Sequence, residues 1–208
     1  MEPKQQTLAA FCAATASDAP TPGGGGVAAA VAALAAALSA MVARWTIGKK
    51  GYQEQEAAMQ LLAEKADALR IQLLDDIQRD GDSFDAFMAA LALPKENEAQ
   101  KTARRDAMQT ALKEAARVPL AIAERAAQVM PLAEQAVRDG NRNLVTDGLI
   151  SAVLARAACV SALYNVKINL ASIQDQELTD SLWQQVRSLQ QEVTVAEARI
   201  LALQPDLI

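Results

Sequence analysis

The sequence predicts an all-α protein, a single-domain bundle of long antiparallel helices. Good helix formers, chiefly Ala, Leu, Gln, Glu and Arg, fill most of the chain, and no stretch shows the apolar–polar alternation of a strand. Proline and glycine divide the chain into separate helical stretches. Because 208 residues suffice for one well-buried core, we expect one domain over residues 1–208.

This punctuation bounds the expected helices. The glycine run Gly23–Gly26 precedes the second helix, Pro119 suits a first helical turn because its missing N–H costs nothing there, and Pro131 should kink the helix that follows. Near the end of the chain, apolar residues from Leu178 to Leu203 recur at steps of three and four, which predicts a seam against another helix, in this chain or in a second copy. The expected helices cover residues 6–17, 27–46, 52–91 with a break, 98–117, 119–139, 148–172 and 176–203.

Charge and composition argue against several classes of function. Twenty basic and 25 acidic residues leave a net charge of -5, which disfavours nucleic-acid binding. The chain has no histidine, so Ser-His and Cys-His nucleophiles and His-ligated zinc are excluded. Cys12 and Cys159 lack a metal-type spacing, and we expect both to be reduced and buried.

The N-terminal residues lack the basic start and leucine-rich core of a signal peptide, so we expect a cytoplasmic protein. The stretch from Val27 to Ala43 has the length of a membrane span. It is mostly alanine, however, which gives little insertion energy. We therefore expect a buried helix and no membrane association.

The glycine run is the first candidate for a site. Gly23, Gly24, Gly25 and Gly26 lie where a helix begins, so bare main chain and free N–H groups can approach an anion. The run lacks the Gly-Lys-Ser/Thr ending of a phosphate loop and follows no strand. Lys49 and Lys50 follow the end of the helix expected over residues 27–46, and they can be a solvated helix end or a binding group.

Two polar patterns are further candidates. Asp76 and Asp80 lie four residues apart on one helix face, where mutual repulsion and burial would raise their pKa values enough for proton transfer; a solvated acidic stretch is the alternative. The second pattern is a stripe of polar side chains in an apolar helix, which either bond to other helices or bind a polar ligand. It consists of Asp147, Ser151, Ser161, Asn165, Asn169 and Ser172.

Four blocks together carry a family resemblance: "PTPGGGGVAAAVAALAAALSAMVARWTIGKKGY", "DGDSFDAFMAALALPK", "VPLAIAERA" and "GNRNLVTDGLISAVLARAACVSALYNVKINL". They resemble the cyclodeaminase domain of formiminotransferase-cyclodeaminase and its free-standing bacterial relatives, including methenyltetrahydrofolate cyclohydrolases. The resemblance implies an all-helical homodimer that acts on a one-carbon tetrahydrofolate, with no metal or bound cofactor. It places the acid/base aspartate at Asp80, with Asp82 as the near neighbour, and the chain departs from several relatives at Arg79 and Gly81.

The resemblance also indicates which residues would bind the folate. The asparagines and Asp147 would recognise the pterin, while the glycine loop or the lysines would hold the glutamate tail. The expected binding residues are Gly23, Gly24, Gly25, Gly26, Lys49, Lys50, Asp147, Asn165 and Asn169.

Two reactions fit this pattern. We expect formiminotetrahydrofolate cyclodeaminase, because apolar walls over residues 27–42 and 149–163 would keep water from the product. Methenyltetrahydrofolate cyclohydrolase is the alternative, and a non-catalytic helical dimer that binds folate or a protein is the second alternative.

Overall fold

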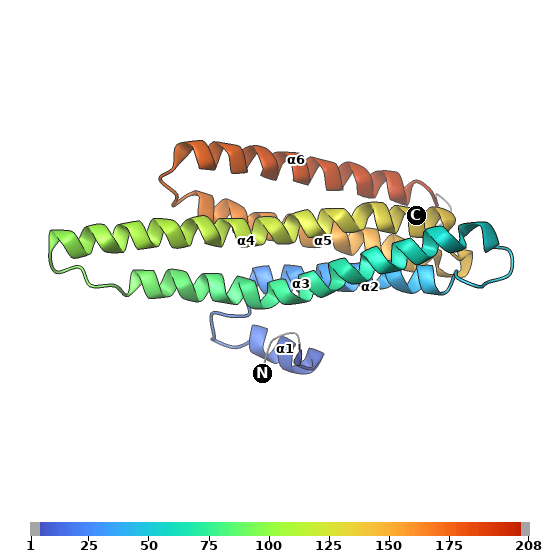
Figure 1. Ribbon diagram of the computed structural model, residues 1–208, viewed down its shortest axis with the longest axis horizontal. Helices are drawn as coiled ribbons and strands as arrows, with labels where there is room; N and C mark the ends of the chain where they lie inside the picture. The colour runs from blue at the N-terminus through green and yellow to red at the C-terminus, as the bar shows by residue number, and fades with distance from the viewer. Residues whose placement is uncertain (1–4, 205–208) are drawn as a thin grey trace.

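The computed structural model describes residues 5–204, and within that range it contains helices and no strands (Figure 1). The all-α expectation is therefore confirmed, and the ends of the expected domain 1–208 lie outside the described residues. The α-helices are α1 (Leu8–Thr15), α2 (Gly24–Arg44), α3 (Glu56–Leu91), α4 (Glu98–Asp139), α5 (Val145–Leu170) and α6 (Gln176–Leu201). Two 3-10 turns, η2 (Gln53–Gln55) and η3 (Arg142–Leu144), precede α3 and α5.

The long helices form two layers. In Figure 1, α3 and α4 lie in front, α2 and α5 lie behind them, and α6 runs along the upper edge. The contacts between helices agree with this arrangement: α2 contacts α3, α4 and α5, and α6 contacts α4 and α5. The short helix α1 hangs below the bundle next to the start of α2.

Proline and glycine end fewer helices than expected. The stretch 56–91 is one unbroken helix through Gly81, and residues 98–139 form one helix with Pro119 and Pro131 inside it. The expected break in α3 and the expected boundary before Pro119 are therefore wrong. Packing of α4 against α2, α3, α5 and α6 outweighs the single hydrogen bond that each proline removes.

Small side chains allow the core helices to approach closely. Alanines fill most of the buried face of α2, and Ser39 Oγ lies 2.8 Å from Ser151 Oγ across the α2–α5 interface. Ser151 also donates to the Ala35 carbonyl at 2.7 Å. Its place in the polar stripe is thus explained by a helix-to-helix bond, one of the two expected alternatives.

By length and hydropathy, α2 and the segment Arg142–Leu170 are long and apolar enough to cross a membrane. However, 61% of the apolar window in α2 and 50% of that in the α5 segment is buried inside the fold. The expectation that α2 is a core helix is confirmed for its alanine face.

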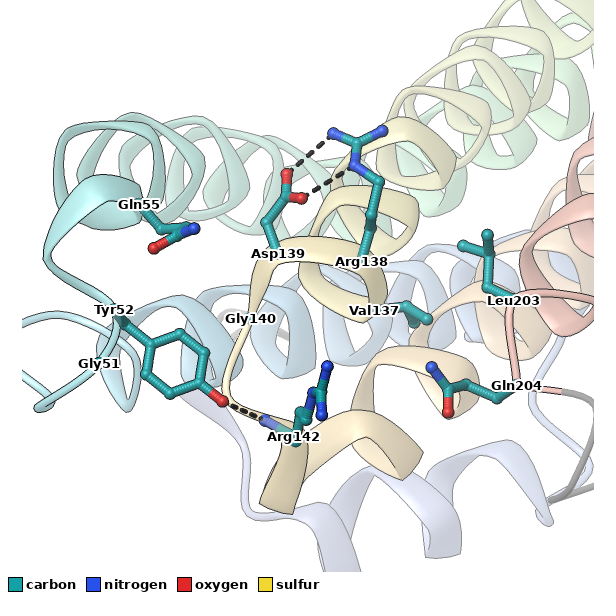
Figure 2. A pocket seen from close by; sticks show the side chains of 10 residues that line it. All are labelled: Gly51, Tyr52, Gln55, Val137, Arg138, Asp139, Gly140, Arg142, Leu203 and Gln204. Atoms are coloured by element: carbon teal, nitrogen blue, oxygen red, sulfur yellow. Dashed lines mark hydrogen bonds and ion pairs between the residues drawn. The ribbon is translucent and has the colours of Figure 1, made fainter.

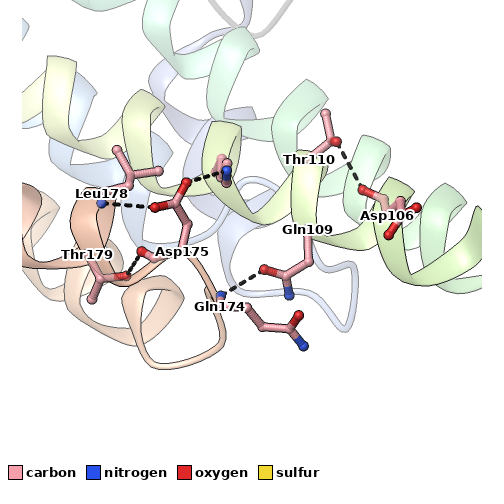
Figure 3. A network of polar contacts seen from close by, with 8 residues as sticks. Asp106, Gln109, Thr110, Gln174, Asp175, Leu178 and Thr179 are labelled. Atoms are coloured by element: carbon pink, nitrogen blue, oxygen red, sulfur yellow. Dashed lines mark hydrogen bonds and ion pairs between the residues drawn. The ribbon is translucent and has the colours of Figure 1, made fainter. Parts of the chain in front are cut away.

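The seam of α6 packs within this chain. Leu182, Val186, Val193 and Ile200 are buried against α4 and α5. A polar network fixes the start of this helix: Asp175 caps it by accepting from Leu178 N at 3.1 Å (Figure 3).

The same network ties the α5–α6 turn to α4. Gln109 accepts from Gln174 N at 2.8 Å (Figure 3). Lys113 Nζ lies 2.7 Å from Asp175 Oδ2. These bonds connect the turn between α5 and α6 to the N-terminal half of α4.

The two cysteines differ. Cys159 is buried, as expected, and burial raises the pKa of its thiol to about 12. Cys12 is exposed, so the expectation that it is buried is wrong. It lies on α1, which buries none of its residues because it packs on the bundle by one side only.

Candidate active site

A pocket of about 350 Å³ lies where the N-terminus of α2 meets α3, α4 and α5. Its walls combine glycine main chain, two phenylalanines, and the side chains of a carboxylate, a serine and two asparagines. The lining residues are Pro20, Thr21, Gly23, Gly24, Gly25, Asp80, Ser83, Phe84, Phe87, Ala115, Pro119, Asn165, Ile168 and Asn169.

Asp80 is the carboxylate of this pocket. Its Oδ2 accepts a hydrogen bond from the backbone N–H of Gly26 at 2.9 Å. Burial raises the pKa of Asp80, the Gly26 bond opposes the rise, and the charge of Asp76 adds to it. Among the described residues, no lysine or arginine forms an ion pair with Asp80. The site therefore holds a carboxyl group that can exchange a proton more readily than an exposed aspartate.

Asp76, one helical turn before Asp80, is buried and ion-paired. Arg125 Nη1 of α4 lies 2.7 Å from Asp76 Oδ2, and Arg79 Nη1 lies 3.1 Å from Oδ1. Burial raises the pKa of Asp76, while both guanidiniums act in the opposite direction. The predicted pair of carboxylates on one helix face is confirmed, and their surroundings differ: Asp76 has cation partners and Asp80 faces the pocket.

The near neighbour Asp82 points elsewhere. It is exposed and accepts from Gln78 Nε2 at 2.7 Å on the outer side of α3. Position along the helix therefore separates the two candidate aspartates, because a shift of two residues turns a side chain to the other side.

Gly25 is the residue that lets α2 approach this carboxyl group. A Cβ atom at Gly25 would lie 2.5 Å from Asp80 Cγ, 2.7 Å from Oδ2 and closer still to Oδ1. At Gly24 an added Cβ would lie 3.6 Å from Asn165 Nδ2, an ordinary contact. The glycine run therefore serves close packing of helix on carboxylate, and it also brings a helix N-terminus to the pocket.

The two asparagines lie in the pocket wall, and the amide nitrogen of each has a partner within the fold. Pro119 has no N–H to donate to the Ala115 carbonyl, and Asn169 Nδ2 donates to that oxygen at 2.6 Å instead. Asn165 Nδ2 donates to Ser161 O at 3.2 Å within its own helix. Both asparagines line the pocket, and an amide oxygen is a group that can accept a hydrogen bond from a ligand.

The structure does not bring Lys49, Lys50 and Asp147 to this pocket within one chain. They lie at the opposite end of α2 and α5, and α2 alone is about 30 Å long. There Lys49 Nζ donates to Asn141 Oδ1 at 2.7 Å, and the Tyr52 hydroxyl accepts from the Arg142 N–H at 3.1 Å.

Beside these residues, a second hollow of about 560 Å³ lies between the α2–α3 loop and the end of α4 (Figure 2). The binding residues expected from the sequence therefore fall into two groups, one at each end of the α2–α5 pair.

Several pocket residues were not expected from the sequence. Phe84 and Phe87 come from α3, Pro119 from α4, and the charge partner of Asp76 is Arg125. The i, i+4 and i, i+7 spacing of the phenylalanines from Asp80 was the one local signal for their place on the same face. Arg125 and Pro119 reach this region through the packing of α4, and no local spacing in the sequence indicated that they would.

The raised pKa of Asp80 predicts how stability depends on pH. An acid whose pKa in the folded state lies above its unfolded value of 3.8 binds its proton more tightly in the folded state. Its contribution to the free energy of unfolding therefore falls as pH rises from the unfolded pKa through the folded pKa. We expect Asp80→Asn to melt at the same or a higher temperature than the wild type at pH 7, with a smaller gain at pH 4. Thermal melts of both proteins across this range measure it, and a clear loss of stability in Asp80→Asn at pH 7 would contradict it.

Comparison with known proteins gives consistent matches. The family model for formiminotransferase-cyclodeaminase matches residues 7–188. A methenyltetrahydrofolate cyclohydrolase of Methylorubrum extorquens is 39% identical over 94% of each chain. The formimidoyltransferase-cyclodeaminase of Rattus norvegicus is 32% identical over 94% of this chain, which spans 36% of the rat protein.

A solved structure agrees with these sequence matches. The crystal structure of formiminotetrahydrofolate cyclodeaminase from Thermotoga maritima superposes with a TM-score of 0.89 at 31% identity, and the match covers 98% of both chains. Sequence and structure thus match over almost the whole chain, and the protein belongs to the formiminotransferase-cyclodeaminase family.

Proposed function

We propose that this protein is a tetrahydrofolate one-carbon enzyme that closes or opens the carbon bridge between the folate nitrogens N5 and N10, with Asp80 as its acid/base group. The observation that carries the proposal is a half-buried carboxyl group without an ion-pair partner among the described residues, directed into a pocket at a helix N-terminus. The names of the similar proteins supply the substrate class.

Closure of the bridge needs a proton at two places. In cyclodeamination, N10 attacks the carbon of the protonated formimino group, a new C–N10 bond forms as the C=N bond to the terminal nitrogen becomes single, and N10 loses its proton. The bond from that carbon to the terminal nitrogen then breaks, and the nitrogen leaves as ammonia after taking up a proton. A carboxyl group with a raised pKa can accept the first proton and donate the second.

Opening of the bridge uses the same group. Water attacks the bridging carbon of the methenyl cation and loses a proton, which leaves a hydroxyl on that carbon. One C–N bond then breaks while the hydroxyl gives up its proton and the released nitrogen takes one up, so the formyl product forms and one proton is released overall. An ionised Asp80 beside the carbon also stabilises the cationic bridge before attack. One carboxylate therefore serves both reactions.

The pocket walls bear on which reaction dominates. The expected preference for cyclodeamination depended on apolar walls from residues 27–42 and 149–163, but the pocket is lined by neither segment. Ser83, Asn165 and Asn169 line it instead and can hold a water molecule. Hydrolysis is therefore the candidate that this wall and the 39% identical cyclohydrolase favour, while the Thermotoga structure supports cyclodeamination.

A pair of assays tests the proposal. Formiminotetrahydrofolate is supplied and ammonia is followed; methenyltetrahydrofolate is supplied and the loss of its near-ultraviolet absorbance is followed above the uncatalysed rate. We expect turnover in at least one assay and faster methenyl hydrolysis. Turnover in neither, with folate still bound in a calorimetric titration, would support the non-catalytic alternative.

We also propose that the reaction needs no metal or bound cofactor, since proton transfer and electrostatic stabilisation are all that either route requires. Full activity after dialysis against a chelator is the expected result. A loss of activity that is restored by added metal would contradict it. The cytoplasmic location stays a prediction.

The protein is expected to be a homodimer. An apolar side of α2 and α5 stays exposed in the single chain, with Leu34 at 56% and Ile168 at 69% exposure. Exposed apolar surface of this kind is typical of an interface between subunits. Light scattering at micromolar concentration should give twice the mass of the 22.1 kDa chain. A stable monomer at that concentration would contradict this prediction.

A further inference from the structure

A buried ion pair joins α3 to α4 one helical turn before the pocket carboxyl group. Asp76 is 1% exposed, and its Oδ2 lies 2.7 Å from Nη1 of Arg125 on α4. Arg125 also donates from Nε to Gln72 Oε1 at 3.1 Å, so its guanidinium bonds two side chains of α3. The half-exposed Arg79 lies 3.1 Å from the other carboxylate oxygen. Both oxygens of Asp76 are therefore held by cations.

Packing alone gives little reason for a charge at this place. Removing a carboxylate and a guanidinium from water costs free energy that their attraction often does no more than offset, and well-packed apolar residues commonly replace such a pair without loss of stability. The residues that flank this pair along both helices are buried and apolar: Leu73, Ile77, Ile122 and Ala126. The ion pair therefore calls for an explanation other than the joining of α3 to α4.

The pair lies close to the carboxyl group that faces the pocket. Asp76 and Asp80 are four residues apart on α3, which separates their Cβ atoms by about 6 Å. Burial raises the pKa of Asp80, the N–H of Gly26 acts in the opposite direction, and the negative charge of Asp76 raises the pKa further. Arg125 bonds Asp76 from the α4 side. The charge that acts on Asp80 is therefore that of an ionised neighbour which the arginine keeps ionised.

The other elements around Asp80 supply no competing charge. α2 carries no charged side chain before Arg44 at its far end, and Arg44 pairs with Asp67. On α4, Arg117 and Glu124 are exposed. α5 contributes two asparagines to the pocket wall, and their amides do not titrate. Among the described residues, Asp76 with its arginines is therefore the charged group that the fold places against Asp80.

We propose that Asp76 and Arg125 are positioning residues of the active site, which hold a negative charge one helical turn from Asp80 and so set how firmly Asp80 keeps the proton that it exchanges. The proposal rests on the proposed function for the role of Asp80 as the acid/base group. Its two halves act in opposite directions. Loss of the Asp76 charge lets Asp80 ionise at lower pH, and loss of the Arg125 charge makes Asp80 ionise at higher pH.

The pH dependence of kcat/KM tests this opposition. In either folate reaction an ionised Asp80 accepts the first proton, so kcat/KM falls on the acidic side as Asp80 becomes protonated. Asp76→Asn should move this acidic limb to lower pH by about one pH unit, and Arg125→Gln should move it to higher pH by about as much. Arg125→Lys keeps the charge and should restore a limb close to that of the wild type.

A purely structural ion pair gives a different result. Lower kcat/KM in both variants with an unmoved acidic limb would overturn the proposal. If Arg125→Gln does not fold, Asp76→Asn alone decides, because its limb either moves to lower pH or does not. Asp67→Asn is the matched control, since it removes the same charge from an ion pair on α3 about 20 Å before Asp80. An equal shift in Asp67→Asn would show an effect of net charge and contradict the proposal.

A titration without folate separates this proposal from the proposed function. In protein labelled with carbon-13 at the aspartate carboxyl groups, the NMR signal of Asp80 is the one that Asp80→Asn lacks. We expect this signal to titrate at lower pH in Asp76→Asn and at higher pH in Arg125→Gln. Those displacements in a protein that turns over neither folate would refute the proposed function alone. Turnover of a folate with an Asp80 signal that titrates at the same pH in wild type and both variants would refute the role of the ion pair alone.

Discussion

Asp80→Asn is expected to leave the fold intact and to lower turnover by about 10²–10⁴-fold, the usual contribution of general acid–base catalysis. Asparagine keeps the shape of the side chain, and its Oδ1 can still accept the hydrogen bond from Gly26 N–H that the carboxylate accepts at 2.9 Å. What it cannot do is exchange a proton. Steady-state kinetics with the preferred folate measure the effect, and circular dichroism checks the fold.

The matched control for this variant is Asp82→Asn. This side chain is exposed on the outer side of α3 and bonds only to Gln78 in the described structure, so its removal should change turnover little. If Asp80→Asn kept near-normal turnover, the acid/base group would have to be sought elsewhere. Normal activity in Asp82→Asn and a large loss in Asp80→Asn would assign the proton transfer to the pocket carboxylate.

Gly25→Ala is expected to have the second large effect. Its Cβ would lie 2.5 Å from Cγ of Asp80 and 2.7 Å from Oδ2, so either the carboxyl group rotates away or α2 and α3 move apart. Such overpacking typically costs about 1–3 kcal/mol of stability. A displacement near 1 Å at a catalytic group can lower activity by about 100-fold. Thermal melts and kinetics on the same preparation measure both effects.

Gly81→Ala is the control for the added methyl group. Its Cβ would come no closer than 3.9 Å to Thr21, and alanine is the better helix former by up to about 1 kcal/mol. We expect equal or higher stability and unchanged activity, although Gly81 is adjacent to Asp80 in sequence. If Gly25→Ala behaved like Gly81→Ala, close contact between helix and carboxylate would not be what the glycine run provides.

The sequence determined the helical class and the faces of individual helices. Helix formers and the absence of strand alternation predicted the class, and the spacing of Asp76 and Asp80 placed both on one face of α3. The glycine run was singled out for a close approach of its main chain to an anion, and in the structure it lies against the Asp80 carboxyl group; its part in binding a folate stays a prediction. These features could be predicted because they depend on residues within a few turns of one another.

Only the tertiary structure decided whether a proline ends a helix and which carboxylate faces the pocket. Pro119 lies inside α4 because Asn169, from α5, takes the Ala115 carbonyl that the proline leaves without a donor. Asp76 has a cation partner because α4 brings Arg125 to within 2.7 Å of it, which leaves Asp80 as the carboxylate of the pocket. Each of these partners is about 50 residues or more away in sequence, and periodicity carries no information across that separation.

The positions of the expected binding residues depend on the same distinction. Spacing along α5 puts Asn165 and Asn169 on one side of that helix. Only the antiparallel packing of α5 on α2 places that side in the pocket wall that contains Asp80. The same packing carries Lys50 and Asp147 to the far end of the bundle. Sequence order therefore determined what each helix presents, and packing determined which presented groups meet, because a contact between helices is set by their whole apolar faces rather than by the few polar residues that form the site.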